Sequence, residues 1–479
     1  MKEKQVTLLK KEGFLKPIIR GWYLLDADLH NTDTGTSVLW HESYWTFIGQ
    51  YLQEYLGDAY CVSAEQSLDL HTGSNVFPTQ LLIGNLKKIN RVVKLPRDLS
   101  ISLYTANQLP DELMRHEGVI ILSLEEALTR VGPAYYRRQP QEITLALQSA
   151  NLTLLLEKLL GNARVTAAGR LAGAFRAVNQ SLAADEILST MQAAGLSVTE
   201  TAPFDEAVPD ITLLRPRSPH AGRIALLWAS LADRMAARID LPLAKPVDID
   251  TAIAKLEETY TNDAYHSLSI EGYRVTPELI ERVRSGLWNP DDSDEDQKHL
   301  DGLAARGYWE AHNDVKESIR QLHSGKLSVE ALRGAVALWY RSLFGPMVRA
   351  GVLRPTDLAG YRNRAVFIRG SRHTPLPAEA LVDAMETLFE CAEKEPHPLT
   401  RAVLCHWLIG YIHPFPDGNG RSARFLMNAL LVAAGYPWTI IRLETRQQYM
   451  AALEELSVNQ NPDPFIDVIL EAMAYRWTA

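Results

Sequence analysis

The sequence predicts a mainly α-helical protein, with an all-helical C-terminal half that carries one β-hairpin and an N-terminal half of α+β type. Two observations lead to this fold class. Beyond Gly222 nearly every segment has helical spacing of its apolar residues, whereas residues 1–215 alternate short β-type runs with helical ones. A chain of 479 residues is also too long for one ordinary core, so we expect about two or three domains.

The composition is that of a soluble globular protein. Hydrophobic residues make up 46% and charged residues 22% of the chain, and the formal net charge is -9. This acidic balance gives no overall attraction to nucleic acid. The 3 cysteines form no CxxC pair, and the charged N-terminus lacks the apolar core of a signal peptide. We therefore expect no disulfide framework, no zinc site, and a cytoplasmic location.

Punctuating residues divide the chain into three parts. We expect an α+β regulatory region over residues 1–215, a linker and helix over 216–245, and a helical domain over 246–479. In the first part, Val119–Leu122 has the composition of a strand and Leu145–Leu160 has the spacing of one apolar helix.

Several elements of the C-terminal half are marked by their end signals. Thr276 followed by Pro277 and Glu278 predicts a helix N-terminus. Gly435 followed by Pro437 predicts the end of a helix that begins near Gly420. The segment Arg364–Pro377 is too rich in β-formers and turn residues for a helix, so we expect a hairpin that turns near Gly370.

The most informative segment is HPFPDGNGRSAR, which spans His413–Arg424. An apolar helix leads into His413, two prolines end it, and a glycine turn then opens a second helix. Glycines at a helix N-terminus let backbone N–H groups approach an anion, and the helix dipole favours negative charge there. Arg421 and Arg424 lie on one face of the first turn, where arginines are unfavourable unless a polyphosphate sits between them.

The same segment supplies the other groups that phosphate chemistry needs. Asp417 offers an oxygen ligand for Mg²⁺, and His413 can accept a proton from an attacking hydroxyl. Each feature alone has a simpler interpretation, since DGNG is usually a turn, a histidine after a helix is usually a polar end, and an arginine pair usually faces solvent. All of them within twelve residues favour a nucleotide site.

This segment resembles the signature of the Fic family, H-x-F-x-[DE]-G-N-G-R-x-x-R, and matches it at every specified position. The resemblance implies that AMP is transferred from ATP to a protein hydroxyl, with pyrophosphate leaving. It also implies the roles of individual residues, namely His413 as the base, Phe415 as the anchor of the loop, Asp417 as the Mg²⁺ ligand, Gly418, Asn419 and Gly420 as the anion hole, Arg421 as a phosphate support, and Arg424 as the γ-phosphate ligand.

The resemblance extends beyond the motif, from about Pro246 to the C-terminus. Residues Arg364–Pro377 occupy the place of the family's flap, a hairpin that docks the target peptide by strand addition, and Gly360, Tyr361 and Arg362 before it also look familiar. The docking residues would be Val366, Phe367 and Ile368.

An upstream glutamate has a regulatory interpretation. Residues 263–272 have the pattern of a short helix closed by Gly272, with Ser267 and Glu271 on one face. Alone, Glu271 would be a surface acid. Next to a Fic motif, however, the segment resembles the inhibitory motif [ST]-x-x-x-E-[GN], which implies that Glu271 pairs bidentately with Arg424 and blocks the γ-phosphate. The same glutamate could position water for AMP removal.

The N-terminal residues have a second, separate resemblance. Leu8–Leu25 is similar to the recognition helix and wing of a winged helix, and the region that follows, with the basic run Lys87–Arg97, is similar to abortive-infection antitoxins. This implies a DNA contact, although basic side chains on a small domain are more often solvated surface.

Two classes of function follow. The first is an autoinhibited protein adenylyltransferase, and the alternative is a nucleotide-sensing transcriptional or antitoxin-type regulator without turnover. The presence of His413 favours the enzyme, because a sensor needs the anion hole but not a base. Gly418 and Gly420 favour AMP transfer over phosphotransfer.

Overall fold

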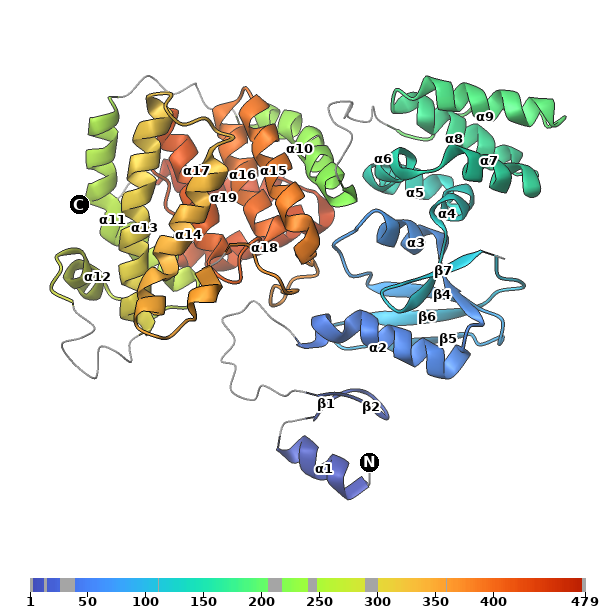
Figure 1. Ribbon diagram of the computed structural model, residues 1–479, viewed down its shortest axis with the longest axis horizontal. Coiled ribbons are helices and arrows are strands. Elements are labelled where there is room, and N and C mark those ends of the chain that lie inside the picture. The colour runs from blue at the N-terminus through green and yellow to red at the C-terminus, as the bar shows by residue number, and fades with distance from the viewer. Residues whose placement is uncertain are drawn as a thin grey trace. The chain divides into compact units, whose positions relative to one another are not determined.

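The computed structural model describes residues 3–12, 15–25, 39–110, 112–205, 218–239, 248–288, 300–358 and 360–475. These residues form two compact units, one of Met1–Leu226 with Val366–Gly370 and one of Leu227–Ala365 with Ser371–Ala479. Helices dominate these described residues, and the strands among them all belong to the first unit (Figure 1). The predicted fold class, mainly α with an α+β N-terminal part, is confirmed.

The first unit is built from three small sheets and nine helices, counted over the described residues. Its strands are β1 (Leu15–Ile19), β2 (Trp22–Leu25), β3 (Tyr60–Val62), β4 (Gln80–Asn85), β5 (Arg91–Lys94), β6 (Ser100–Thr105), β7 (Leu113–His116) and β8 (Val119–Leu122). Its helices are α1 (Glu3–Lys11), α2 (Leu39–Leu56), α3 (Ala64–His71), α4 (Leu124–Arg130), α5 (Pro133–Arg138), α6 (Pro140–Ser149), α7 (Leu152–Gly161), α8 (Val165–Ala177) and α9 (Ser181–Ala193).

The central sheet of this unit has the order β3-β4-β6-β5. Strands β4 and β6 are parallel, with Leu81 opposite Ile101, whereas β3 and β5 are antiparallel edge strands. The aromatic side chains Tyr44, Phe47 and Tyr51 of α2 lie in one core with the sheet residues. The hairpins β1–β2 and β7–β8 are separate two-stranded sheets. One helix followed by one hairpin does not make a full winged helix, so that resemblance and the DNA contact stay predictions.

The helical part of the first unit has its own core, to which all the helices from α4 to α9 contribute. The predicted single helix Leu145–Leu160 is wrong, because the chain breaks between α6 and α7. Asn151 is the reason, since its side chain accepts hydrogen bonds from the N–H groups of Thr153 and Leu154 and thereby starts a new helix. No single helix among the described residues is long and apolar enough to cross a membrane, and only the bent pair α6 and α7 passes that test jointly.

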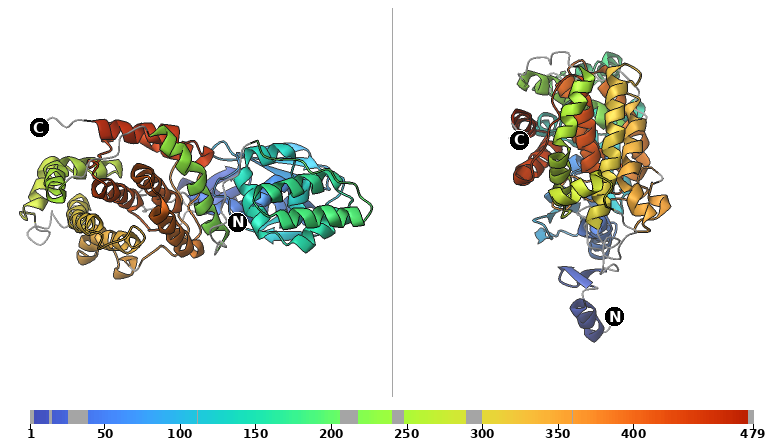
Figure 2. Two further views of the ribbon diagram at one scale, coloured as in Figure 1. Left: turned by 90° about the horizontal axis from the view of Figure 1, so that it is seen from above. Right: turned by 90° about the vertical axis from the view of Figure 1, so that its left-hand side faces the viewer.

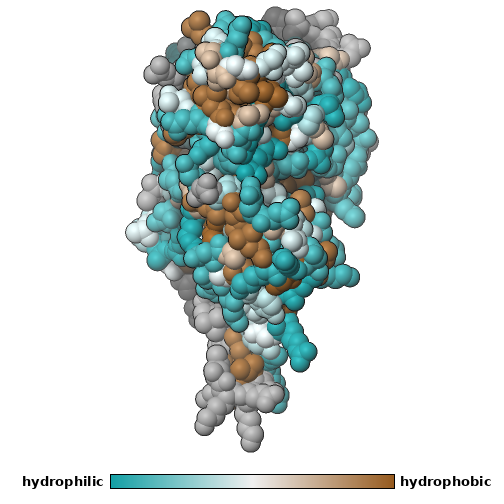
Figure 3. Space-filling model, turned by 90° about the vertical axis from the view of Figure 1, so that its right-hand side faces the viewer, coloured by the Kyte–Doolittle hydropathy of each residue, from teal (hydrophilic) through white to brown (hydrophobic). Residues whose placement is uncertain are grey.

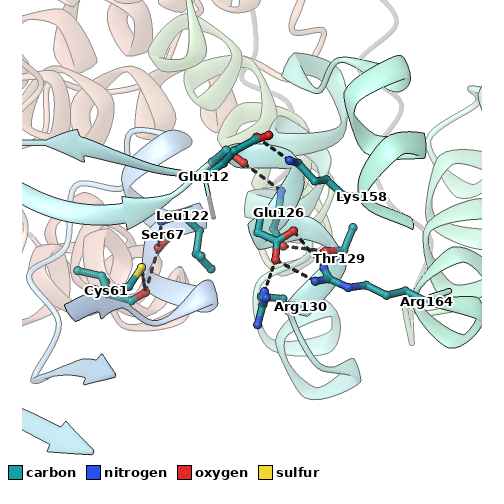
Figure 4. Close-up of polar contacts among 11 residues, drawn as sticks. Cys61, Ser67, Glu112, Leu122, Glu126, Thr129, Arg130, Lys158 and Arg164 are labelled. Carbon is teal, nitrogen blue, oxygen red and sulfur yellow. Dashed lines mark hydrogen bonds and ion pairs between the residues drawn. The ribbon is translucent and has the colours of Figure 1, made fainter. Parts of the chain in front are cut away.

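A partly buried ion network joins α4 to the residue before α8 (Figure 4). Glu126 accepts hydrogen bonds from Arg130 Nε at 2.5 Å and from Arg164 Nη2 at 2.9 Å, and Arg164 also contacts Thr129. Burial opposes ionisation of Glu126, but the two guanidinium groups hold the pKa of its carboxyl below the usual value. The face of the molecule drawn in Figure 3 is mainly hydrophilic with separate hydrophobic patches, as is usual for folded proteins.

The second unit is a helical bundle (Figure 2). Helix α13 packs against α11, α14 and α17, and α16 packs against α17. The elements are α10 (Pro219–Arg238), α11 (Ile249–Ile270), α12 (Pro277–Arg284), α13 (Leu300–His323), α14 (Leu332–Arg349), α15 (Leu381–Lys394), α16 (Pro398–Ile412), α17 (Asn419–Ala433), α18 (Arg446–Asn459) and α19 (Asp463–Ala474), with short 3-10 turns η2 (Pro355–Leu358), η3 (Ala378–Ala380) and η4 (Leu443–Thr445).

Several predicted helix ends of the second unit are confirmed. Thr276 accepts a hydrogen bond from the N–H of Leu279 and begins α12, and Gly435 follows α17 with a φ of 89°. The helix expected in 216–245 is α10, whereas 216–217 and 240–245 lie outside the described residues. The boundary between the two units falls inside α10.

The first half of α10 is held to its unit by a buried ion pair. Arg223 donates to both carboxylate oxygens of Glu142, at 2.9 and 2.5 Å, and to the carbonyl oxygen of Thr72 at 3.0 Å. Both charged side chains are only 4% exposed. Such a pair adds little net stability over an apolar contact, but the loss of one partner leaves a charge buried without compensation.

We therefore expect Arg223→Met to destabilise the first unit by roughly 3–5 kcal/mol. The matched control on the same helix is Arg238→Met, which removes an ion pair whose side chains are 48% and 46% exposed and should cost at most about 1 kcal/mol. Urea unfolding, monitored by hydrogen exchange of the backbone amides in α3 and α6, measures the difference in unfolding free energy between each variant and the parent. Equal effects of the two variants would contradict a structural role for the buried pair.

Candidate active site

The centre of the site is the turn between α16 and α17. Helix α16 ends at His413, whose backbone is left-handed with φ 53° and ψ 59°. This conformation is uncommon for a residue other than glycine and occurs often at functional sites. Pro414 cannot continue the helix because it has no N–H to donate, so the chain leaves α16 at this point.

Two contacts fix the loop that follows. Phe415 is fully buried, and its ring stacks on that of Tyr340 with centroids 4.2 Å apart. The Asn419 amide donates to the carbonyl oxygen of Phe415 at 2.8 Å and accepts from its N–H at 2.9 Å. The prediction of Phe415 as an anchor fits this arrangement. Asn419, predicted in the anion hole, uses its side chain to close the loop and has only its backbone N–H for a ligand.

The N-terminus of α17 is left open. Gly418 is the N-cap residue, with a φ of 74°, and no side chain of the described residues accepts a hydrogen bond from the first N–H groups of the helix. A Cβ atom at Gly418 would lie 2.7 Å from the Phe344 ring, so the position requires glycine. The backbone N–H groups of Asn419, Gly420 and Arg421 therefore form an uncapped, positively polarised helix end, which is the usual setting for a phosphate.

His413 is arranged as a proton acceptor. Its Nδ1 lies 3.3 Å from the carbonyl oxygen of Gly410, which can only accept, so Nδ1 carries the proton. Nε2 has no hydrogen-bond partner among the described residues. Burial, assisted by the positive charge of Arg362, lowers the pKa of His413 to about 4. The imidazole is therefore neutral near pH 7, with a free lone pair on Nε2.

Arg421 and Asp417 lie on the other side of the turn. Arg421 is fully buried between the rings of Tyr273 and Phe344, at 5.2 and 4.9 Å from their centroids. Its Nη2 is 3.3 Å from an Asp417 oxygen, whereas Nε and Nη1 have no partner among the described residues. Two buried donors of a fixed cation without acceptors are costly unless an anion binds them, which fits the predicted phosphate role of Arg421.

Arg424 is occupied by the predicted inhibitory segment. Its Nε donates to the Ser267 hydroxyl at 2.9 Å, and its Nη2 donates to the Ser267 carbonyl at 3.0 Å and to Glu271 Oε1 at 2.7 Å. The structure therefore contains the predicted ion pair, but the bidentate geometry is wrong. One carboxylate oxygen pairs with Arg424 Nη2, while Ser267 accepts from Nε and also from Nη2.

The Glu271 carboxylate lies directly over the turn. A Cβ atom built on Gly420 would be only 2.4 Å from Glu271 Oε1. Burial opposes ionisation, yet Arg424 and Arg421 hold the pKa of Glu271 below its usual value, so the group is charged near pH 7. A negative charge thus occupies the position where the open helix end would receive an anion.

The helix that carries Glu271 is longer than predicted. The prediction of a short helix over 263–272 is wrong, because α11 runs for 22 residues before Gly272 ends it with a φ of 95°. Its last turn is fixed by Arg446, whose Nε donates to the carbonyl oxygen of Ile270 at 2.8 Å, and by His266, whose Nδ1 accepts from the N–H of Leu443 at 3.0 Å. Arg446 and Tyr273 were not predicted, since single residues outside the motif carry no sequence signal.

The predicted hairpin flap is also wrong. Residues 364–377 form an irregular loop with a turn at Arg369–Gly370, and no two strands pair across it. Gly370 has a φ of 81°, which allows the turn. Pro375 and Pro377 have no backbone N–H to donate to a neighbouring strand, which explains why the turn is not flanked by paired strands. The proposed docking residues Val366, Phe367 and Ile368 group with the first unit, where Phe367 is 7% exposed.

The described residues contain no group of three or more histidine, cysteine, aspartate or glutamate side chains that could hold a metal ion. The side chain of Asp417 is 30% exposed and accepts from the N–H of Gly418 at 2.5 Å. Mg²⁺ commonly takes one or two carboxylates and fills its remaining positions with water and substrate phosphates. A single aspartate beside an anion site fits that pattern, and it does not fit a resident metal centre.

Comparisons with known proteins agree with this geometry. Residues 337–431 match the Fic/DOC family model. The chain is 32% identical over 205 residues to protein adenylyltransferase Fic of Nematostella vectensis, which covers 42% of this chain and 44% of that protein. It is 27% identical over 213 residues to protein adenylyltransferase fic-1 of Caenorhabditis elegans, and this alignment covers 42% of this chain and 38% of that protein. The chain thus spans less than half the length of these relatives.

Solved structures are similar at a lower level. The fragment Fic-1 from C. elegans has a TM-score of 0.38 at 20% identity and covers 70% of this chain and 93% of its own. A Fic domain containing signaling protein from Bacteroides thetaiotaomicron has a TM-score of 0.35 at 17% identity and covers 53% and 93%.

This chain contains a Fic domain. The match includes the whole turn from His413 to Arg424 and the loop 364–377, whereas Ser267 and Glu271 lie upstream of it. The resemblance of the motif to the Fic family is therefore confirmed. The inhibitory role of the segment before the Fic domain stays a prediction that the ion pair supports.

The depressed pKa of His413 makes the stability of the Fic domain depend on pH. The unfolded imidazole binds a proton below about pH 6.5, but the folded one does so only near pH 4, so stability is lost as the pH falls through this window. We expect the parent to lose roughly 2 kcal/mol more than His413→Gln between pH 7 and pH 5. Urea unfolding at both values measures this.

The control for this experiment is His323→Gln, because His323 is an exposed residue of α13. It should keep the pH dependence of the parent. If His413→Gln and the parent lose the same stability on acidification, His413 is not held neutral by the fold.

Proposed function

We propose that this chain is an autoinhibited protein adenylyltransferase that transfers AMP from ATP to a side-chain hydroxyl of a protein. The observation that carries the proposal is the free Nε2 of a buried, neutral His413 at the edge of an uncapped helix N-terminus. The names of the relatives, all protein adenylyltransferases, agree with it. A cytoplasmic location remains part of the proposal.

The reaction proposed is an in-line displacement at the α-phosphorus of ATP. The target hydroxyl loses its proton to His413 Nε2 as its oxygen forms the new bond to the α-phosphorus. The bond from the α-phosphorus to the bridging oxygen breaks, and pyrophosphate leaves with the electron pair. The N–H groups of Asn419 and Gly420 and the free donors of Arg421 stabilise the charge on the phosphates.

We also propose that Mg²⁺ enters with ATP and that Asp417 binds it. When bound, the ion neutralises phosphate charge. The partial exposure of Asp417 and its place beside Arg421 support this assignment. The chain itself orients Asp417 through the N–H of Gly418.

Inhibition is proposed to work by competition for Arg424. Arg424 cannot take the γ-phosphate while it donates to Glu271, and the Glu271 carboxylate repels the phosphate from the space over Gly420. ATP would then bind in a pose unsuited to in-line attack. Because Arg446 and His266 fix the last turn of α11, Glu271 does not leave without a cost.

We expect Glu271→Gly to raise AMP transfer on the order of tenfold or more, since each 1.4 kcal/mol of lost competition is a factor of about ten. Incubation of the full chain with α-labelled ATP and cell extract, followed by identification of the labelled protein, measures the rate and the target. Transfer no faster than that of the parent would contradict autoinhibition. Release of AMP from labelled target by the parent but not by Glu271→Gly would support the predicted AMP removal.

The control for this experiment is the double variant Glu271→Gly, His413→Ala. It should bind ATP but label nothing, because the anion hole remains and the base is gone. If it labels as fast as Glu271→Gly, the assignment of His413 is wrong. A nucleotide-sensing regulator, the alternative function, would bind ATP in both variants and transfer AMP in neither.

The proposed metal ligand has a separate test. Asp417→Asn in the Glu271→Gly background should reduce AMP transfer and require several-fold more Mg²⁺ for half-maximal rate, because a neutral amide is a weaker ligand for a hard cation. Titration of Mg²⁺ at saturating ATP measures this. An unchanged Mg²⁺ requirement would exclude Asp417 as the ligand.

A further inference from the structure

Arg362 is a buried cation without an ion-pair partner among the described residues. It is 5% exposed. Its Nε donates to the carbonyl oxygen of His413 at 2.8 Å, and its Nη1 donates to that of Arg364 at 2.8 Å. Its Nη2 contacts the carbonyl oxygen of Leu376, and its backbone N–H donates to that of Pro414 at 2.9 Å. A buried guanidinium bound only to carbonyl oxygens is expensive, which calls for a functional reason.

The four acceptors belong to two segments of the proposed active site. His413 and Pro414 begin the proposed phosphate-binding turn, and His413 is the C-cap residue of α16. Arg364 and Leu376 lie at the two ends of the loop 364–377, for which a hairpin flap was predicted. A positive charge at a helix C-terminus is favourable, and the planar fork of an arginine holds its acceptors at fixed spacing. One side chain therefore ties the position of His413 to both ends of the loop.

The charge of Arg362 also acts on the imidazole. Burial is the largest cause of the lowered pKa of His413, Arg362 is the next, and the Gly410 carbonyl and Glu271 act in the opposite direction. Burial lowers the pKa of Arg362 itself to about 10, against the effect of Glu379, so the guanidinium stays charged at neutral pH. A fixed cation next to a histidine disfavours the imidazolium form.

We propose that Arg362 is a positioning residue that clamps the two ends of the loop 364–377 to His413 and supplies a positive charge that disfavours the protonated form of this histidine. The clamp needs the fork of an arginine, whereas the charge effect needs only a cation at this place. The proposal rests on the proposed function for its consequence in AMP transfer. Both physical effects can be measured without any transfer.

The test compares Arg362→Met and Arg362→Lys with the control Arg341→Met, which changes an exposed arginine of α14. All are made in the full chain. Histidine NMR titration, with the His413 signal assigned from its loss in His413→Ala, should show a rise of about one pH unit in the pKa of His413 for Arg362→Met. Arg362→Lys and Arg341→Met should leave that pKa unchanged.

Hydrogen exchange measures the clamp. The backbone amides of residues 371–374 and of Leu376 should exchange about tenfold faster in both Arg362 variants, because a loss of about 1.4 kcal/mol of local stability is a factor of ten. Arg341→Met should exchange like the parent. If Arg362→Met does not fold, Arg362→Lys still decides the clamp, and an unchanged exchange rate in it would overturn the proposal.

AMP transfer from α-labelled ATP to protein in cell extract, measured with Glu271→Gly, connects the proposal to activity. When the Arg362 variants are added to Glu271→Gly, the pH at which the rate of AMP transfer falls on acidification should be higher with Arg362→Met but unchanged with Arg362→Lys. An unchanged pKa of His413 in Arg362→Met, or an equal rise in both variants, would overturn the charge effect. Absence of all AMP transfer with the NMR and exchange results as expected would count against the proposed function and not against the placement of Arg362.

Discussion

The active-site geometry depends on the helix end at Gly418 remaining uncapped. Most helices satisfy their first N–H groups with a side-chain oxygen, and this chain has Asp417 and Asn419 next to the position where that would occur. Neither caps the helix, because Asn419 closes the loop on Phe415 and Asp417 accepts from Gly418. The helix end is therefore available to an external anion, and everything else at the site either approaches that anion or replaces it.

The charges around the turn show how the replacement works. Arg421 and Arg424 are both buried, and Glu271 is the acid that pairs with Arg424. Two buried guanidinium groups around one carboxylate leave a deficit of negative charge, which Asp417 offsets only at 3.3 Å from Arg421. A triphosphate would supply the missing charge. In the proposed function, inhibition and catalysis are therefore two ways to satisfy the same cations, and the balance between them would depend on how firmly α11 is held.

The sequence contained the local part of this site. The turn from His413 to Arg424 could be predicted because its residues are contiguous and each has a backbone or charge reason for its position. The pairing of Glu271 with Arg424 required the family resemblance, since the two residues are 153 positions apart. Other features could not be predicted, because they depend on tertiary packing, which the secondary-structure propensities of single residues do not encode. These features are the single hydrogen bond of Glu271 to Arg424, the length of α11, and the contacts of Arg446 and Tyr273.

The errors in the fold have the same origin. Residues 364–377 are rich in β-formers, yet a strand pair needs a partner ladder, and here the carbonyl oxygens of Arg364 and Leu376 accept from Arg362 instead. The prediction of one helix over Leu145–Leu160 was wrong because an asparagine is more stable as the N-cap of a new helix than in the interior of a continuous one. In both places a side chain forms hydrogen bonds with backbone groups that would otherwise pair within a helix or a sheet. In the loop 364–377, the side chain that binds these carbonyl oxygens is Arg362, which also donates to the carbonyl oxygen of His413. The contacts that replace a strand pair therefore also place a positive charge next to the proposed base.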